Sequence, residues 1–443
     1  MSQARRETRP RLLQATIDAF GQADLRRRIL LTLALLVVFR FVAHIPVPGA
    51  NVDAMREFLG EGGGIAPLLG MLDLFSGGAM RNLSVAALGV YPYITAVIIM
   101  QLLVPVIPRL QAIAREGEAG RARINQYTHW LTVPLAILNG YGQLMMLQQY
   151  GIVSNIGLSG DALLPTVAMV LAMTAGTMFL VWLGELITEY GIGNGISLII
   201  FGGIVCTLPE LIGRGYLGAT GNMMGLLFFI LLALAIVVLI VIFTEAHRRI
   251  PVQYARSLFR GGRMYRQSGA THIPMRVNSA GMIPVIFAMA LLIMPGVVAS
   301  FFASPDGGGI ANSIVNLFSS GSWFYWLMYF LLVVGFTFFY AMIIFQQQNL
   351  GETLQRQGAF VPGIRPGKPT HQYLTRVITR ITWAGALFLA FVAVSPFILQ
   401  NVTGIQVLIL PSIGMLIVVG VALDTMRQLE AQLLMRRYEG FLK

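Results

Sequence analysis

Long apolar segments recur along the whole chain, and they constrain its fold more than any other feature. Ten are long enough to be predicted as helices that cross a bilayer, which takes about 20 residues each. Only 11% of the 443 residues are charged, against about 25% in soluble domains. The segments lack the polar–apolar alternation of membrane barrel strands. We therefore predict an all-α integral membrane protein. The predicted transmembrane helices are 29–45, 83–104, 127–147, 164–187, 196–211, 223–243, 280–302, 323–345, 381–399 and 407–423.

The basic residues are sorted among the connections between these helices. Of the 31 Lys and Arg residues, 27 fall in five segments that share one side of the membrane if both termini lie there. By the positive-inside rule, that side is the cytoplasm. Topology thus explains the net charge of +12, and a nucleic-acid-binding domain is not expected. The five segments are 1–28, 106–126, 245–276, 346–380 and 427–443.

Ten helices divide into two halves of five. Because five is odd, the halves have inverted topology, which places a site at their interface. The predicted parts are a cytoplasmic N-terminal tail with an amphipathic helix (1–28), the first half (29–212), an external hinge (213–222), the second half (223–428) and a cytoplasmic C-terminal tail (429–443).

The stretch Leu68–Leu103 differs from the other apolar segments. Its first piece, Leu68–Phe75, is too short to cross a bilayer, and Ser76-Gly77-Gly78 separates it from the second predicted helix. A short apolar piece at membrane depth must be surrounded by protein or line a cavity. The stretch therefore predicts a movable stopper inside a channel.

Residues for catalysis, metal binding or ion coupling are scarce. The sequence has no zinc-protease, serine-hydrolase or nucleotide-loop motif, and its five histidines stand at no ligand spacing. Asp73, Glu185, Glu189 and Asp424 lie at helix boundaries, whereas ion-coupled transporters place such groups in mid-helix. We expect no enzyme activity, cofactor or metal, and we keep an inverted-repeat secondary transporter of a small solute only as the alternative function. Cys206, in an apolar segment, is predicted to be a buried, inert thiol.

Two of the predicted cytoplasmic segments, 245–276 and 346–380, are much longer than simple connections. Both combine arginines with apolar and aromatic residues. One interpretation is a pair of solvated basic loops against anionic membrane lipids. The other, which the interleaved apolar groups favour, is a docking surface for a large cytoplasmic partner, with phosphate contacts to ribosomal RNA included.

Four strings of residues carry a resemblance to a known family. They are LFSGGA (74–79), ALGVYPYITAVIIMQLL (87–103), TMFLVWLGELITEYGIGNGISLIIFGGIV (177–205) and GAFVPGIRPG (358–367). Together they resemble the SecY family, the channel subunits of the protein translocon in bacterial plasma membranes. The resemblance covers essentially the whole chain.

The resemblance implies a protein-conducting channel with an hourglass pore between two pseudo-symmetric halves, closed by a plug helix over residues 68–82. The plug residues that it implies are Leu68, Leu69, Met71, Leu72, Asp73, Leu74, Phe75, Ser76, Gly77 and Gly78. It also implies a ring of apolar side chains at the constriction, namely Val90, Ile94, Ile196, Ile200, Ile286 and Ile417. The pattern alone is explained as well by ordinary apolar residues that pack within a helix bundle. Val90 departs from the isoleucine more usual at its position, so the constriction is expected to be wider or more dependent on the plug.

The family also opens sideways, which lets transmembrane segments of its substrates enter the lipid. Thr95, Gln101 and Asn278 are the candidate polar contacts of this lateral gate, and helix-packing hydrogen bonds explain them equally well. The implied partners are the SecE and SecG subunits, the SecA motor ATPase, a translating ribosome and the signal sequences of preproteins. The candidate docking residues are Arg248, Arg249, Arg256, Arg260, Arg263 and Arg365.

Overall fold

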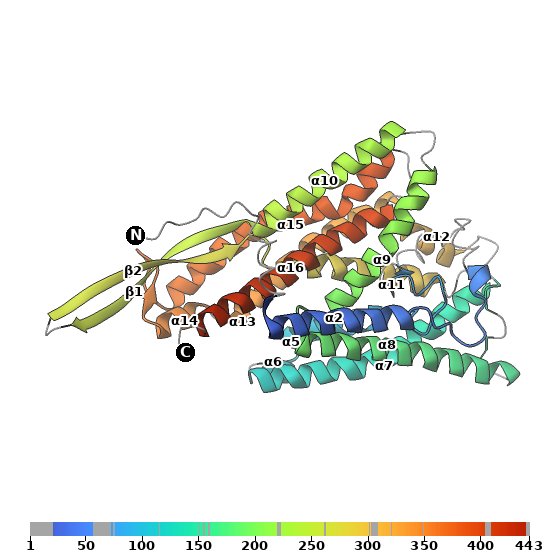
Figure 1. Cartoon of the computed structure of the whole chain (residues 1–443), viewed down its shortest axis with the longest axis horizontal. Coiled ribbons are helices and arrows are strands. Elements are labelled where there is room, and N and C mark those ends of the chain that lie inside the picture. The colour runs from blue at the N-terminus through green and yellow to red at the C-terminus, as the bar shows by residue number, and fades with distance from the viewer. Residues whose placement is uncertain are drawn as a thin grey trace. The chain divides into compact units, whose positions relative to one another are not determined.

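The computed structural model of the chain is mainly helical, with one small sheet (Figure 1). It describes residues 21–55, 72–73, 76–114, 116–149, 151–153, 156–157, 160–218, 223–260, 263–300, 302, 309–319, 321–348, 350–403 and 409–439. Most of the predicted amphipathic helix in the N-terminal tail lies outside these residues. The chain divides into two compact units by its contacts, which are described separately: 1–217 with 293–322 and 417–443, and 218–292 with 323–416.

The first unit is built on four helices that pack side by side: α2, α5, α7 and α8. Its helices are α2 (Ala23–Val42), α5 (Tyr91–Val106), α6 (Pro108–Ala114), α7 (Glu118–Gln149), α8 (Leu163–Tyr190), α9 (Gly195–Gly218), α12 (Ile310–Leu317) and most of α16 (Ile409–Glu439). A small apolar cluster of Leu25, Ile192, Leu429 and Leu433 joins the start of α2 to the α8–α9 turn and to the end of α16. Here the last part of the chain is packed against the first described helix.

The second predicted transmembrane helix begins later than expected. Residues 83–104 were predicted as one helix, but α5 starts only at Tyr91, with Pro92 in its first turn, a position that proline favours. The residues before it form turns whose backbone bonds to another segment: Val47 N donates to Leu83 O (2.8 Å) and Val85 N to Ile45 O (2.9 Å). These bonds satisfy buried backbone groups that a helix would otherwise have satisfied.

The second unit contains a long β-hairpin. Strands β1 (His247–Arg260) and β2 (Arg263–Arg276) are antiparallel, and β3 (Ala359–Phe360) pairs with the other edge of β1, so the strand order is β2-β1-β3. The all-α prediction was wrong for this segment. Along β1, exposed Arg249 and Pro251 alternate with buried Ile250 and Val252, which is the period of a half-buried strand.

An apolar cluster, which we name the hairpin base, joins the foot of this hairpin to the second long segment between helices. It contains Ile250, Val252, Met275, Phe345, Leu354, Ala359, Val361, Leu374 and Val377, all 7% exposed or less. These residues come from the sheet, from Val361 directly after β3, and from α13 (Trp323–Gln348), α14 (Leu350–Arg356) and α15 (Lys368–Thr403). Segments 245–276 and 346–380 therefore fold as one body and are not independent loops. The remaining helices of this unit are α10 (Met223–Glu245) and most of α11 (Ile283–Ser300).

Several described helices have the length and composition of membrane spans. Three qualify by themselves: 160–190, 323–356 and 368–395. A fourth qualifies if α5 and α6, which meet at a bend of 102°, form one broken span. Shorter apolar helices occupy 195–207, 234–245 and 283–296. The chain is thus a multi-pass membrane protein, and the count of ten transmembrane helices stays a prediction.

The buried-thiol prediction for Cys206 was wrong, because its side chain is exposed on α9. Trp130, Leu164 and Leu234 on other helices are similarly exposed, at 70%, 81% and 67%. An apolar helix of a membrane protein has lipid on its outer face. Apolar neighbours along the sequence therefore do not indicate burial within the protein.

Candidate functional site

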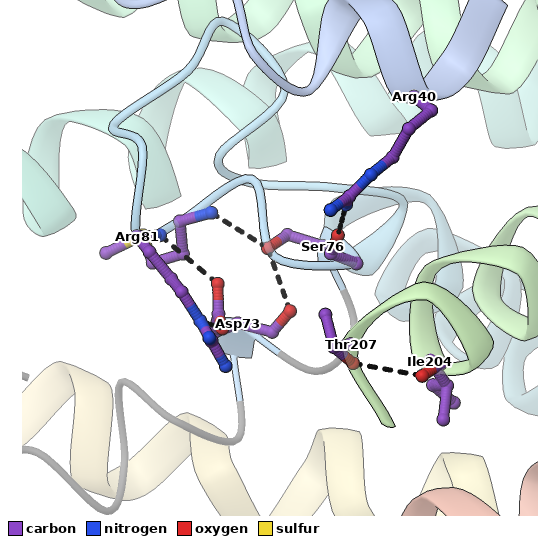
Figure 2. Close-up of polar contacts among 8 residues, drawn as sticks. Arg40, Asp73, Ser76, Arg81, Ile204 and Thr207 are labelled. Carbon is purple, nitrogen blue, oxygen red and sulfur yellow. Dashed lines mark hydrogen bonds and ion pairs between the residues drawn. The ribbon is translucent and has the colours of Figure 1, made fainter. Parts of the chain in front are cut away.

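The structure describes half of the predicted plug residues, and all of these are buried. Leu72, Asp73, Ser76, Gly77 and Gly78 are described and buried. Five others lie outside the described residues: Leu68, Leu69, Met71, Leu74 and Phe75. The described part forms a compact polar turn at the end of the predicted plug (Figure 2). We call Asp73, Ser76, Gly77, Gly78 and Arg81 the plug anchor.

An ion pair lies at the centre of the plug anchor. The Nε of Arg81 lies 2.5 Å from Oδ2 of Asp73, and the backbone N–H of Arg81 donates to Oδ1 (3.1 Å). The Asp73 side chain is only 4% exposed and that of Arg81 18%. A buried carboxylate needs such partners to remain charged. The sequence analysis identified Asp73 but missed Arg81.

Hydrogen bonds to the backbone close the turn around this pair. The carbonyl of Asp73 accepts from the Oγ of Ser76 (3.1 Å) and from the N–H of Gly78 (2.9 Å), and Ser76 Oγ accepts from the N–H of Met80 (3.1 Å). Gly77 and Gly78 have φ values of +67° and +84°. Only glycine adopts this backbone conformation without steric cost, so both positions require it.

The turn also packs closely against α9 of the same unit. A Cβ added to Gly77 would lie 2.6 Å from the Cα of Gly203, and one added to Gly78 would lie 3.1 Å from Cγ2 of Thr207. On α2, Nη1 of Arg40 donates to the carbonyl of Gly77 over 2.6 Å (Figure 2). The plug anchor is therefore held between two helices, and Arg40 is a contact that the sequence analysis missed.

The predicted ring residues are mostly buried, and two pairs of them lie one helical turn apart. The N–H of Ile94 donates to the carbonyl of Val90 (3.0 Å), so these residues lie one helical turn apart, as Ile196 and Ile200 do on α9. Ile196 is only half-buried, and a Cβ on Gly184 would lie 2.5 Å from its Cδ1, so Ile196 packs on α8. Ile286 and Ile417 are buried in different units. The ring as a whole stays a prediction.

The three candidate gate residues divide into two kinds. Thr95 donates to the carbonyl of Tyr91 within its own helix (3.0 Å), which is the packing bond that was the alternative interpretation. The side-chain oxygens of Gln101 and Asn278 are buried with no hydrogen-bond partner among the described residues. Buried acceptors of this kind are rare. Gln101 and Asn278 are therefore the stronger gate candidates, and the gate itself stays a prediction.

A polar cluster that the sequence analysis missed connects α5 to α7 and α8. Oε1 of Glu185 accepts from Nδ2 of Asn125 (2.9 Å) and lies 3.0 Å from Nε2 of His129. The Tyr93 ring stacks on His129 with 5.7 Å between the ring centroids. The cluster ties α5, which carries Ile94 and begins directly after Val90, to its neighbours in the first unit. The sequence signal was Glu185, which has no Lys or Arg three or four residues away on its own helix.

The candidate docking arginines lie on the hairpin and beside its base. Arg248, Arg249 and Arg365 are exposed. For Arg256, Arg260 and Arg263 the structure describes only the strands that carry them, where Arg260 pairs with Arg263 beside the hairpin turn. The carbonyl of Arg365 accepts from Oγ1 of Thr370 (2.8 Å), which fixes the loop before α15. Arg365 is thus held on a folded support.

Comparison with known proteins gives relatives over nearly the full length. The chain is 42% identical over 443 residues to the protein translocase subunit SecY of Streptomyces lividans, covering 98% of this chain and 100% of the relative. It is 41% identical to the protein of the same name from Thermotoga maritima, covering 97% and 98%.

Solved structures show the same fold. A structure described as "The structure of a protein conducting channel" matches with a TM-score of 0.59 at 19% identity, covering 92% of both chains. Sec61 in a canine ribosome-channel complex from the endoplasmic reticulum matches with a TM-score of 0.55 at 19% identity, also over 92% of both chains. The family model SecY matches residues 84–426, and together with the full-length relatives this shows that the chain belongs to the SecY family.

Proposed function

We infer that this chain is the channel-forming subunit of a protein translocase. The observation that carries this inference is the 42% identity over nearly the whole chain to a protein translocase subunit. The same observation excludes the alternative of a small-solute transporter. A channel of this class moves unfolded preproteins across the membrane and releases transmembrane segments sideways into lipid. Energy comes from a partner, because the sequence contains no nucleotide-binding motif.

The proposed constriction is a ring of Val90, Ile94, Ile196, Ile200, Ile286 and Ile417. A narrow apolar constriction loses its water and so blocks ions. Branched side chains adapt around a passing polypeptide without selecting its sequence. The burial of Val90, Ile94 and Ile200 supports this placement, and the α5–α7–α8 cluster would hold the first two residues in position.

We propose that residues 68–82 are the plug, with the plug anchor at its end. One similar structure is described as showing that the plug domain of SecY stabilises the closed state of the channel and maintains a membrane seal. The burial of Asp73 and Gly77 supports the same role here, because a stopper must pack inside the protein. Plug and ring would then close the channel in series.

For the lateral gate, we propose that Gln101 and Asn278 supply polar contacts which change when the gate opens. The proposed partners are SecE, SecG, the SecA motor, translating ribosomes, signal sequences and membrane lipids, and the proposed location is the bacterial plasma membrane with both termini in the cytoplasm. The hairpin and the loop of Arg365 would be the docking surface. Their shared apolar core supports this, since a partner can push only on a folded body.

A transport assay tests the proposed function. The purified complex, in vesicles with the motor ATPase and ATP, is expected to protect a radiolabelled preprotein from external protease. Vesicles without ATP are the control. Absence of protection, together with saturable uptake of a small solute, would contradict the channel.

A further inference from the structure

Arg40 is a charged residue in the last turn of α2, a helix that the sequence predicts to cross the membrane. A charge within a predicted transmembrane helix is costly unless a partner is present, and such a residue is by default a candidate for function. Its partner in the structure is 37 residues away along the chain, the carbonyl of Gly77, at 2.6 Å (Figure 2). The function proposed above makes no use of this contact.

The contact depends on the backbone shape of the plug anchor. Gly77 has φ +67°, and its Cα side faces Gly203 on α9 while its carbonyl meets Arg40 on α2. The acceptor is a backbone oxygen, so any movement of the turn away from α2 breaks the bond. A hydrogen bond from a charged donor is roughly twice as strong as a neutral one. Arg40 therefore resists departure of the turn more than a neutral donor would.

A second explanation for Arg40 must be separated from this one. A cation in the last turn of a helix interacts favourably with the helix dipole, whether or not anything lies beside it. The backbone of that turn is also engaged, since the Arg40 carbonyl lies 2.8 Å from Nδ1 of His44. Under this explanation Arg40 stabilises α2 only, and its removal has the same effect with or without a plug.

We propose that Arg40 is the latch of the plug: its hydrogen bond to the Gly77 carbonyl holds the channel closed and sets how strong a signal sequence must be to open it. The proposal rests on the proposed function, in which residues 68–82 are the plug. When the channel opens, Arg40 loses the Gly77 carbonyl as its acceptor, and this loss adds to the free energy that opening requires. Loss of one hydrogen bond to a charged group corresponds to a shift of about 10-fold in the ratio of closed to open channels.

The test compares Arg40→Met in two backgrounds, the full chain and a chain lacking 68–82, each in complex with its companion subunits. Planar-bilayer conductance measures the resting leak, and vesicle transport of a preprotein without its signal sequence measures selectivity. In the full chain we expect a leak about 10-fold higher and export of the defective preprotein. In the plug-deleted chain, which already leaks, the substitution changes nothing further. Arg27→Met, at an exposed arginine in the first turns of the same helix, is the matched control.

Two further variants separate loss of the Arg40–Gly77 contact from misfolding of the chain. Arg40→Lys keeps the charge and an ammonium group that can donate to the Gly77 carbonyl, and it is expected to keep most of the low resting conductance. Gly203→Ala leaves Arg40 intact but pushes Gly77 away, because its Cβ would lie 2.5 Å from the Gly77 Cα, and it is expected to leak as Arg40→Met does. A plug-deleted chain that leaks while neither Arg40→Met nor Gly203→Ala does would overturn the latch alone. A plug-deleted chain that stays tight would overturn the plug, and the latch with it.

Discussion

The plug anchor and the hairpin base hold two segments of the chain by opposite means. In the plug anchor, an ion pair and hydrogen bonds to backbone groups stabilise a turn. The glycines of this turn contact α9. In the hairpin base, nine buried apolar residues and a ladder of strand pairs fuse two long segments into one body. The first is polar and directional, and the second is apolar and cooperative.

This difference fits two mechanical tasks. A hydrogen bond between protein groups contributes about 1 kcal/mol net, because water replaces the partner when the bond opens. Truncation of one leucine in an apolar core costs about 2 to 5 kcal/mol, because nothing refills the space. A part that must leave and return is best held by exchangeable polar contacts. A part that must transmit force is best held by a core.

The largest expected effect comes from preventing release of the plug anchor. In a Cys206→Ser background, Gly78→Cys and Thr207→Cys would place two thiols within disulfide reach, since a Cβ at Gly78 lies 3.1 Å from Cγ2 of Thr207. Oxidation is expected to stop preprotein transport almost completely, and a reductant to restore it. Thr207→Cys alone and Gly78→Cys alone are the controls, the second because a side chain at Gly78 strains its left-handed backbone. Normal transport by the oxidised pair would show that the plug anchor stays in place during transport.

The next effect separates the hairpin base from the plug anchor. Leu374→Ala, at a fully buried position of the base, should destabilise the hairpin by about 3 kcal/mol through the cavity that it leaves. Limited proteolysis within 247–276 should become faster, while the resting conductance stays unchanged. Leu387→Ala, at a 47% exposed position of the same helix, is the matched control. A rise in resting conductance would mean that the two regions are not independent.

A smaller effect is expected from the ion pair of the plug anchor. Asp73→Asn keeps the shape of the side chain but removes the charge that faces Arg81, which costs about 1 to 3 kcal/mol. The resting conductance should rise about 10-fold, and protease resistance of the hairpin should not change. Asp53→Asn, at an exposed carboxylate before the plug, is the control. Equal resting conductance in the two variants would show that the ion pair does not contribute to closure of the channel.

The sequence predicted the membrane class and the family because these depend on long apolar runs and on continuous strings such as LFSGGA. It did not predict the contacts that hold the plug anchor. Arg81 stands eight residues from Asp73 across an irregular glycine turn, and Arg40 stands 37 residues from Gly77, so neither contact lies within one regular helix or strand. Contacts made by irregular backbone are visible only when the backbone is known.

The hairpin was missed for a different reason. Its polar–apolar alternation lies in Arg249 to Val252, but the seven arginines of 245–276 dominated the interpretation of that segment as a basic loop. Exposed arginines are compatible with a strand whose other face is buried. The α5 boundary was missed because residues 83–90 are apolar enough for a helix, although tertiary backbone bonds to 45–47 form instead.

The smallest expected effect concerns the docking surface. Arg365→Glu reverses an exposed charge in the loop that the hairpin base supports, and exposed charge pairs are worth at most about 1 kcal/mol. Motor-driven transport should therefore fall by about fivefold, with the resting conductance and the proteolysis of the hairpin unchanged. Arg356→Glu, which removes only a surface pair with Glu352, is the matched control. Normal transport by Arg365→Glu would exclude this arginine from docking. A rise in the resting conductance would mean that the hairpin base affects closure of the channel.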